Sequence, residues 1–205
     1  NDFDVMVPAK VWQPIDTQKI KDWDKVSNLC KTGKLTSDSR VGQGDAPFRH
    51  LWVDADGNKV NGPSRYVTAV PGWHNADSMG YNPDDTGREI DSWGELFSPD
   101  FKGRVALLNV PQIGTMDAAM GIEALGLYKF KDKGNMTKAE IDFLIDFLIK
   151  KKKEGHFRAF WETFGQSVNL MVSGEVAIES MWSPAVTAVK AEGVPCRYAV
   201  PKEGM

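Results

Sequence analysis

Aromatic and polar side chains follow several predicted strands of this chain at the point where each strand ends. In open α/β sheets, a ligand lies beyond the carboxyl ends of the strands. An aromatic face beside a few polar groups suits a small molecule. The sequence therefore predicts a solute-binding site, and the residues expected to form it are Trp73, His74, Gln112, Thr115, Asp117, Glu179, Trp182 and Ser183.

The charges near these strand ends leave two ligand chemistries open. Asp77, Asp117 and Glu179 are candidates to pair with an amine, because a buried ammonium needs a carboxylate partner. The helix expected to begin at Thr115 offers free N–H groups, which favour a carboxylate or another anion. An amine-containing solute is the first expectation, and an anionic solute is the alternative.

The two tryptophans of this set also allow two interpretations. A single Trp73 or Trp182 is more often a core residue than a ligand platform. Their position after two different predicted strands favours a site, and an indole face suits a cation. We therefore expect both indoles to line a shared hollow.

The sequence gives no support for a catalytic or metal centre. It lacks the G-x-S-x-G, H-E-x-x-H and P-loop motifs. Its three histidines, His50, His74 and His156, lie in unrelated contexts, and no cofactor is expected. The acidic run that starts at Asp54 resembles a calcium loop, but Arg65 occupies the place of the last glutamate, so a hairpin turn is predicted. A hydrolase whose nucleophile is hydrogen-bonded to His74 remains the alternative from another class.

Composition and charge describe an ordinary globular chain of 205 residues. A net charge of −3 with one short lysine run, Lys150–Lys153, argues against nucleic-acid binding, which needs clustered cations. No apolar run reaches the roughly 18 residues that a membrane-spanning helix needs. The chain starts at Asn1 without a signal peptide, so we expect a mature or excised piece. Whether Cys30 and Cys196 pair is left open.

Hydrophobic periodicity and turn residues predict an α/β fold. Strands are expected at Asp2–Val7, Tyr66–Val70, Ser78–Tyr81, Arg104–Val110, Val176–Met181 and Cys196–Val200. Helices are expected at Asp91–Phe97, Thr115–Leu127, Lys138–Lys153, Gln166–Ser173 and 183–193. The third of these helices begins with a capping box formed by Thr137 and Glu140. Strands and helices alternate from Ser78 onward, which favours a largely parallel sheet.

Three motifs in the second half resemble a known family. The segment Trp93–Leu107 resembles the W-x-x-L-x-x-P-x-x-K-G stretch of periplasmic solute-binding proteins. The segment Ser173–Ser183 resembles their G-E-V strand followed by tryptophan, and Tyr198–Gly204 resembles the P-K-E-G stretch of the spermidine/putrescine-binding type. The order of the motifs makes the resemblance to these proteins of ABC importers fairly specific.

The resemblance implies a type II periplasmic-binding-protein fold, α/β, with two lobes that close on a ligand. Residues 1–70 would then be the tail of lobe one, and residues 71–205 would be lobe two, as the central part of a longer protein. The resemblance also implies that Trp182 stacks on the ligand and that Trp73 lies at the first crossing between the lobes. It places the segment 112–117 where the polyamine-binding members carry acidic residues. The protein would be a periplasmic monomer, not an enzyme, that delivers a small molecule to a membrane permease.

Overall fold

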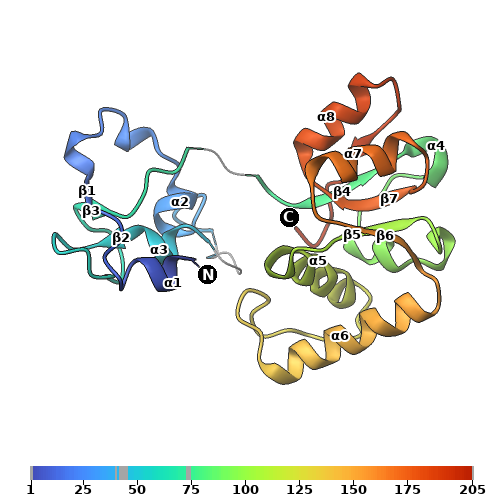
Figure 1. The fold of residues 1–205 in the computed structure, drawn as a ribbon, viewed down its shortest axis with the longest axis horizontal. Helices are drawn as coiled ribbons and strands as arrows, with labels where there is room; N and C mark the ends of the chain where they lie inside the picture. The colour runs from blue at the N-terminus through green and yellow to red at the C-terminus, as the bar shows by residue number, and fades with distance from the viewer. Residues whose placement is uncertain (1, 40, 42–45, 73–74, 205) are drawn as a thin grey trace. The chain divides into compact units, whose positions relative to one another are not determined.

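The computed structural model describes residues 2–39, 41, 46–72 and 75–204. The chain forms two compact units, Asn1–His74 and Asn75–Met205. The sequence placed this boundary between residues 70 and 71. Each unit has its own sheet, and each is described separately (Figure 1).

The first unit is built on a small antiparallel sheet of three strands in the order β1-β3-β2. The strands are β1 (Ile15–Asp16), β2 (Trp52–Val53) and β3 (Tyr66–Val67). The short helices are α1 (Asp2–Met6), α2 (Asn28–Thr32) and α3 (Phe48–Leu51), with 3-10 turns at Thr17–Lys19 and Trp23–Lys25. A small buried cluster of Leu51, Trp52 and Val67 holds the unit together.

The strand predicted at Asp2–Val7 is wrong, because this segment begins with helix α1. Phe3 and Met6 are partly buried and Val7 is buried, which is a helical spacing, whereas Val5 is 70% exposed.

The predicted turn after β2 is confirmed. The Asp54 carboxylate accepts the backbone N–H groups of Asp56 and Asn58, so it closes the turn.

The second unit contains a five-stranded sheet in the order β6-β5-β7-β4-β8. Its strands are β4 (Ser78–Tyr81), β5 (Val105–Leu108), β6 (Phe157–Trp161), β7 (Ile178–Met181) and β8 (Arg197–Tyr198). Strand β5 pairs in parallel with β6 and β7, while β4 runs antiparallel to β7 and β8. All four residues of β5 are buried, as expected of a central strand that is covered on both faces.

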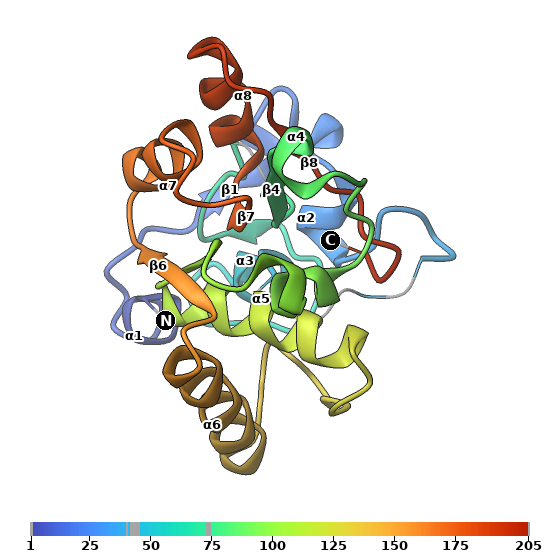
Figure 2. The ribbon, with the colours of Figure 1, turned by 90° about the vertical axis from the view of Figure 1, so that its right-hand side faces the viewer.

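Helices cover both faces of this sheet, as Figures 1 and 2 show for α5 and α6 on one face and α7 and α8 on the other. Their bounds are α4 (Pro83–Thr86), α5 (Pro111–Ala124), α6 (Lys138–Lys153), α7 (Phe164–Val172) and α8 (Ser183–Ala191). Two 3-10 helices, Trp93–Phe97 and Pro99–Phe101, precede β5. Two hydrophobic clusters fill the two faces. Ile178 and Met181 of β7 point to opposite faces of the sheet, and Ile178 packs with residues of α5, whereas Met181 packs with residues of α8.

Several predicted elements of this unit are confirmed, and others need correction. Helix α6 has the predicted bounds, and both bonds of its capping box form. The predicted helix at Asp91–Phe97 is a 3-10 helix capped by Ser92 instead of Asp91. Strand β6 was missed, because its alternate residues are only partly buried at the sheet edge and the preceding helix dominates the local pattern.

Helix α5 begins four residues earlier than predicted. Pro111 occupies its first turn, which a proline tolerates because the N–H it lacks has no partner there. The segment 112–117 was expected to be a loop that leads into the helix, and it is the first two turns of α5 instead. Its side chains are therefore held by a regular backbone directly after β5.

Candidate functional site

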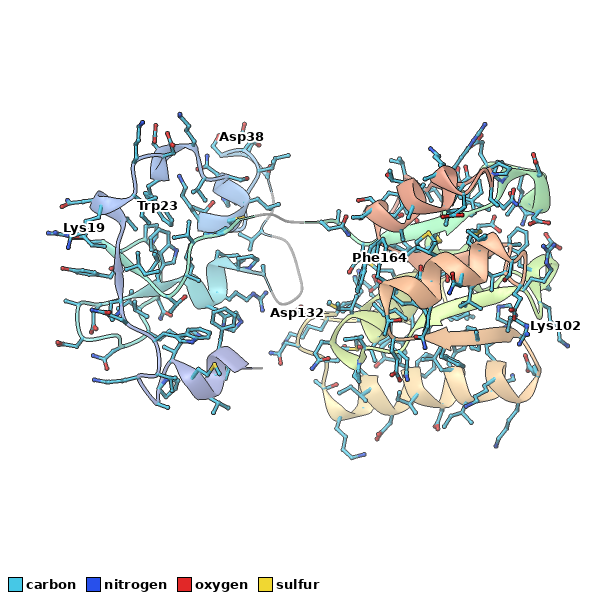
Figure 3. All side chains as sticks on the ribbon, turned by 45° about the horizontal axis from the view of Figure 1, so that its top comes forward. Lys19, Trp23, Asp38, Lys102, Asp132 and Phe164 are labelled. Carbon is cyan, nitrogen blue, oxygen red and sulfur yellow. The ribbon has the colours of Figure 1, made fainter. Side chains whose placement is uncertain are left out.

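The ends of β5 and β7 and the start of β4 meet at one edge of the second unit's sheet. Because β4 is antiparallel to β7, Ser78 is paired with Met181, and the segment before β4 lies at this edge. Figure 3 labels Phe164, which follows β6 at this edge, and Lys102, which precedes β5 at the opposite end. We call this edge the carboxyl edge.

Two carboxyl groups lie at the carboxyl edge. Asp117 is in the second turn of α5 and is only 4% exposed, and Asp77, just before β4, is partly buried. Burial raises the pKa of Asp117 well above its usual range, and the nearby charge of Asp77 raises this pKa further. A hydrogen bond from Ser180 on β7 lowers the same pKa, without reversing the shift. Burial also raises the pKa of Asp77.

A polar network holds the segment that carries Asp77. The Ser183 hydroxyl, at the start of α8, donates to the Asn75 side-chain oxygen over 2.7 Å. The Asn75 amide nitrogen donates to an Asp77 carboxylate oxygen over 3.2 Å. The Tyr198 hydroxyl donates to the carbonyl of Ala76 over 2.5 Å. The segment before β4 is thus tied to both α8 and β8, which orients the Asp77 carboxylate.

Tyr198 adds a neutral donor to this cluster and no charge. Burial raises the pKa of its phenol to about 12, and the carboxyl groups of Asp77 and Asp117 act in the same direction. The phenol is therefore protonated at neutral pH.

Trp182 lies at the same edge, at the N-cap position of α8, where its side chain makes no capping hydrogen bond. Its indole is partly buried and packs edge-on against Trp161 with a ring-centroid distance of 5.2 Å. Trp161 is 1% exposed, and its indole N–H donates to the carbonyl of Ser180 over 3.0 Å. Trp161 is therefore a buried support, and Trp182 presents the accessible aromatic surface.

The structure brings only some of the predicted site residues together. Asp117, Trp182 and Ser183 lie at the carboxyl edge. Gln112 is exposed in the first turn of α5, and the Thr115 hydroxyl donates back to the carbonyl of Pro111. Trp73 and His74 lie outside the described residues.

Glu179 does not join this cluster, because neighbouring residues of a strand point to opposite faces. Ser180 points toward α5, whereas Glu179 points toward α7, where the Ser167 hydroxyl donates to it over 3.1 Å. The other carboxyl oxygen of Glu179 has no hydrogen-bond partner, and burial raises the pKa of Glu179 well above its usual range. We therefore leave Glu179 out of the site.

Burial of Glu179 predicts a pH dependence of stability. The unfolded chain loses the Glu179 proton near pH 4.3, whereas the folded chain keeps it, so stability falls as pH rises above that value, by up to about 1.4 kcal/mol per pH unit. We expect Glu179→Gln to flatten this fall in urea unfolding measured between pH 5 and pH 8. Glu175→Gln is the control, because Glu175 is exposed and paired with Arg158. Equal slopes for Glu179→Gln and the native chain would contradict this prediction.

The predicted set of site residues did not include Asn75, Ser180 or Tyr198. The only sequence signal for Ser180 was its position in a predicted strand, one residue from Glu179. The contact of Asn75 with Ser183 joins residues 108 positions apart, and that of Tyr198 with Ala76 joins residues 122 positions apart. Only the fold shows these contacts.

The described part of the chain has no group of three histidine, cysteine, aspartate or glutamate side chains arranged to hold a metal ion. Cys30 and Cys196 are buried free thiols in different units. His156 is buried and its Nε2 is bonded to the carbonyl of Leu96, so it has a structural role. Among the described helices, none has the length and apolar character needed to cross a bilayer.

A sheet covered by helices on both faces is an α/β layer fold, the class in which ligands lie beyond the carboxyl ends of the strands. The family model of bacterial extracellular solute-binding proteins matches residues 1–205. The chain belongs to this family.

Known proteins resemble the chain in sequence and in fold. The spermidine/putrescine-binding periplasmic protein 1 of Haemophilus influenzae is 28% identical over 119 residues, which cover 58% of this chain and 30% of that protein. The spermidine/putrescine ABC transporter substrate-binding protein PotD of Streptococcus pneumoniae matches 98% of this chain and 50% of its own, with a TM-score of 0.62 and 15% identity.

The TpPotD lipoprotein of Treponema pallidum matches all of this chain and 53% of its own, with a TM-score of 0.67 and 13% identity. These likenesses show the type II periplasmic-binding-protein fold that the sequence predicted. The chain spans about half the length of these two solved structures and less than a third of the curated relative.

Proposed function

We propose that this chain is part of a solute-binding protein of an ABC importer and that it binds a small cationic amine at the carboxyl edge of its second unit. Asp77 and Asp117 carry the proposal. They are two carboxyl groups at one edge, and neither forms an ion pair with a cationic side chain in the described part of the chain. A protonated amine supplies the missing positive charge.

The surroundings of the two carboxyl groups favour an amine over an anion. No side chain caps the first turn of α5, but Pro111 has no N–H group, and the N–H groups of Ile113 and Gly114 already donate to the carbonyl of Val110. This helix start therefore offers an anion few free donors. An anion at that position would lie near the negative charge of Asp77 and would force Asp117 to stay neutral. A cation gains from both carboxyl groups and from the indole face of Trp182.

The relatives support the same choice of ligand. The names of the Haemophilus and Streptococcus proteins describe them as binding proteins for spermidine and putrescine. The alternative of a hydrolase has less support, because the nucleophile it requires would have to contact His74, which the structure does not describe. The described edge has no serine or cysteine beside a histidine base among its hydrogen bonds.

Further properties of the whole protein follow from this proposal. We propose that the protein works outside the cytoplasmic membrane, in the periplasm, as a monomer, and that it passes its solute to a membrane permease. Family membership supports an extracellular location. The assignment of residues 1–70 to lobe one and of 71–205 to lobe two belongs to the same proposal.

A thermal-shift screen tests the function. Putrescine, spermidine, arginine and citrate serve as probes, and a true ligand raises the melting temperature by mass action. We expect the polyamines to raise it and citrate to leave it unchanged. A shift with citrate and none with any amine would overturn the amine proposal.

The role of Trp182 is tested in the same assay. We expect Trp182→Ala to abolish the shift caused by putrescine while the protein still melts cooperatively, because the cation loses its indole face. Phe164→Ala is the matched control, since Phe164 is an aromatic residue 42% exposed at the start of α7. An unchanged shift in Trp182→Ala would remove Trp182 from the site.

A further inference from the structure

Asp117, in the second turn of α5, is only 4% exposed, and the described groups that act on its carboxyl group are neutral or negative. From β7 it meets the Ser180 hydroxyl, which also accepts the backbone N–H of Leu108 over 2.9 Å. The carboxyl group of Asp77, in the segment before β4, interacts electrostatically with Asp117, and Asp117 interacts in the same way with the Tyr198 phenol on β8. Nothing in this set supplies a positive charge.

The other elements that pack on α5 do not change this balance. Helix α6 and the 3-10 helix Trp93–Phe97 contact α5, and neither contributes a charged group that acts on Asp117 in the described part of the chain. On α5 itself, Glu123 is occupied by an ion pair with Lys133 at 2.7 Å. A second negative charge beside Asp77, removed from water, is costly, so Asp117 retains its proton while the site is empty.

We propose that a cationic solute displaces the proton of Asp117 when it binds, so that binding releases protons and becomes tighter as pH rises. This inference rests on the proposed function. The O–H bond of the Asp117 carboxyl group breaks, the proton passes to solvent, and the carboxylate pairs with the ammonium group of the solute. The protonated carboxyl group of the empty site is neutral, and the carboxylate together with its ammonium partner is neutral as well. The positive charge of the ammonium therefore takes the place of the proton.

The coupling determines how affinity changes with pH. Below the pKa of Asp117 in the empty site, each bound solute releases about one proton, and the association constant rises about tenfold per pH unit. Above that pKa the constant levels off, until the amine loses its own proton near pH 10. The site thus selects solutes that are cations at neutral pH and binds them less tightly in acid.

Isothermal titration calorimetry with putrescine tests this coupling. Titrations at several pH values between 5 and 8, each in buffers of different ionisation enthalpy, give the number of protons released from the dependence of the heat on the buffer. We expect the number of protons released per bound putrescine to come close to one at some pH in this range for the native protein. We expect no release from Asp117→Asn, whose amide cannot titrate. If putrescine binds and the number stays at zero, the inference fails and the proposed function stands.

Two further variants assign the proton. Glu179→Gln removes the other buried carboxyl group with a raised pKa, and we expect release to persist in it; loss of release there, with release retained in Asp117→Asn, would overturn the assignment. Asp77→Asn removes the neighbouring charge, so we expect the release to move to lower pH. If Asp77→Asn releases its proton over the same pH range as the native protein, Asp117 is not the group that releases it. This test holds even if Asp117→Asn fails to fold. Absence of binding by any amine would overturn the proposed function and this inference together.

Discussion

Replacing Asp117 by asparagine is expected to weaken the binding of putrescine by about 30-fold or more. Loss of one partner of a buried charge pair costs about 2 to 5 kcal/mol, and 2 kcal/mol corresponds to about 30-fold in affinity. The side chain is 4% exposed, so water cannot replace the carboxylate as a partner of the ammonium. The volume of the side chain is nearly unchanged, so the fold should survive.

Calorimetric dissociation constants at pH 7.5 measure this effect. Asp100→Asn is the matched control, because Asp100 is an acidic residue of the same unit that precedes β5 and pairs with Arg88 at 3.0 Å. We expect its affinity to stay within about twofold of the native value, as for a solvent-exposed charge. If Asp117→Asn binds putrescine as tightly as Asp100→Asn does, Asp117 is not a ligand-binding residue.

Replacing Trp161 by alanine is expected to lower the free energy of unfolding by about 3 to 5 kcal/mol, as for other buried aromatic residues. The indole is 1% exposed, packs on Trp182, and donates to the carbonyl of Ser180. Its removal leaves a cavity between the sheet and α7 and an unpaired carbonyl group at the end of β7.

Phe160→Ala is the control for this prediction, because Phe160 precedes Trp161 on the same strand and is 36% exposed. We expect it to cost about 1 to 2 kcal/mol, since a third of the residue is already exposed to water and less apolar surface is lost than at Trp161. Urea unfolding followed by circular dichroism gives both values. Similar losses in the two variants would show that Trp161 is not a core support of the carboxyl edge.

The sequence was most informative where local signals agree with the fold. Helix α6 could be predicted to the residue, because the Thr137 and Glu140 capping box marks its start and a lysine run marks its last turn. Strand β5 could be predicted because its short, uninterrupted apolar run is typical of a strand covered on both faces.

Local patterns misled where the tertiary environment decides. Alternation in Asp2–Val7 suggested a strand, but Phe3 stacks on His50 and packs edge-on against Trp12 from a helical turn. Strand β6 is the end strand of the described sheet, so two of its five residues are exposed and two are only partly buried, and its apolar signal is weak.

The site itself could be predicted only in part. Strand ends made Trp182 and Ser183 candidates, because ligands lie beyond the carboxyl ends of strands. Asp117 was a candidate because it is the one acid of the segment 112–117, where the resemblance implies acidic residues. The sequence could not decide whether Glu179 or Ser180 faces α5, because alternation fixes only that they face opposite sides. The approach of Asp77 to Asp117 depends on β4 running antiparallel beside β7, which no local pattern specifies.

A crystal structure of the protein with putrescine would show directly which groups hold the amine. We expect an amine nitrogen within about 3 Å of carboxylate oxygens of both Asp77 and Asp117, the usual distance of a charge-assisted hydrogen bond. An ammonium group of the diamine should also lie over the indole face of Trp182. A structure in which putrescine is bound elsewhere, with both carboxyl groups left without it, would contradict the account.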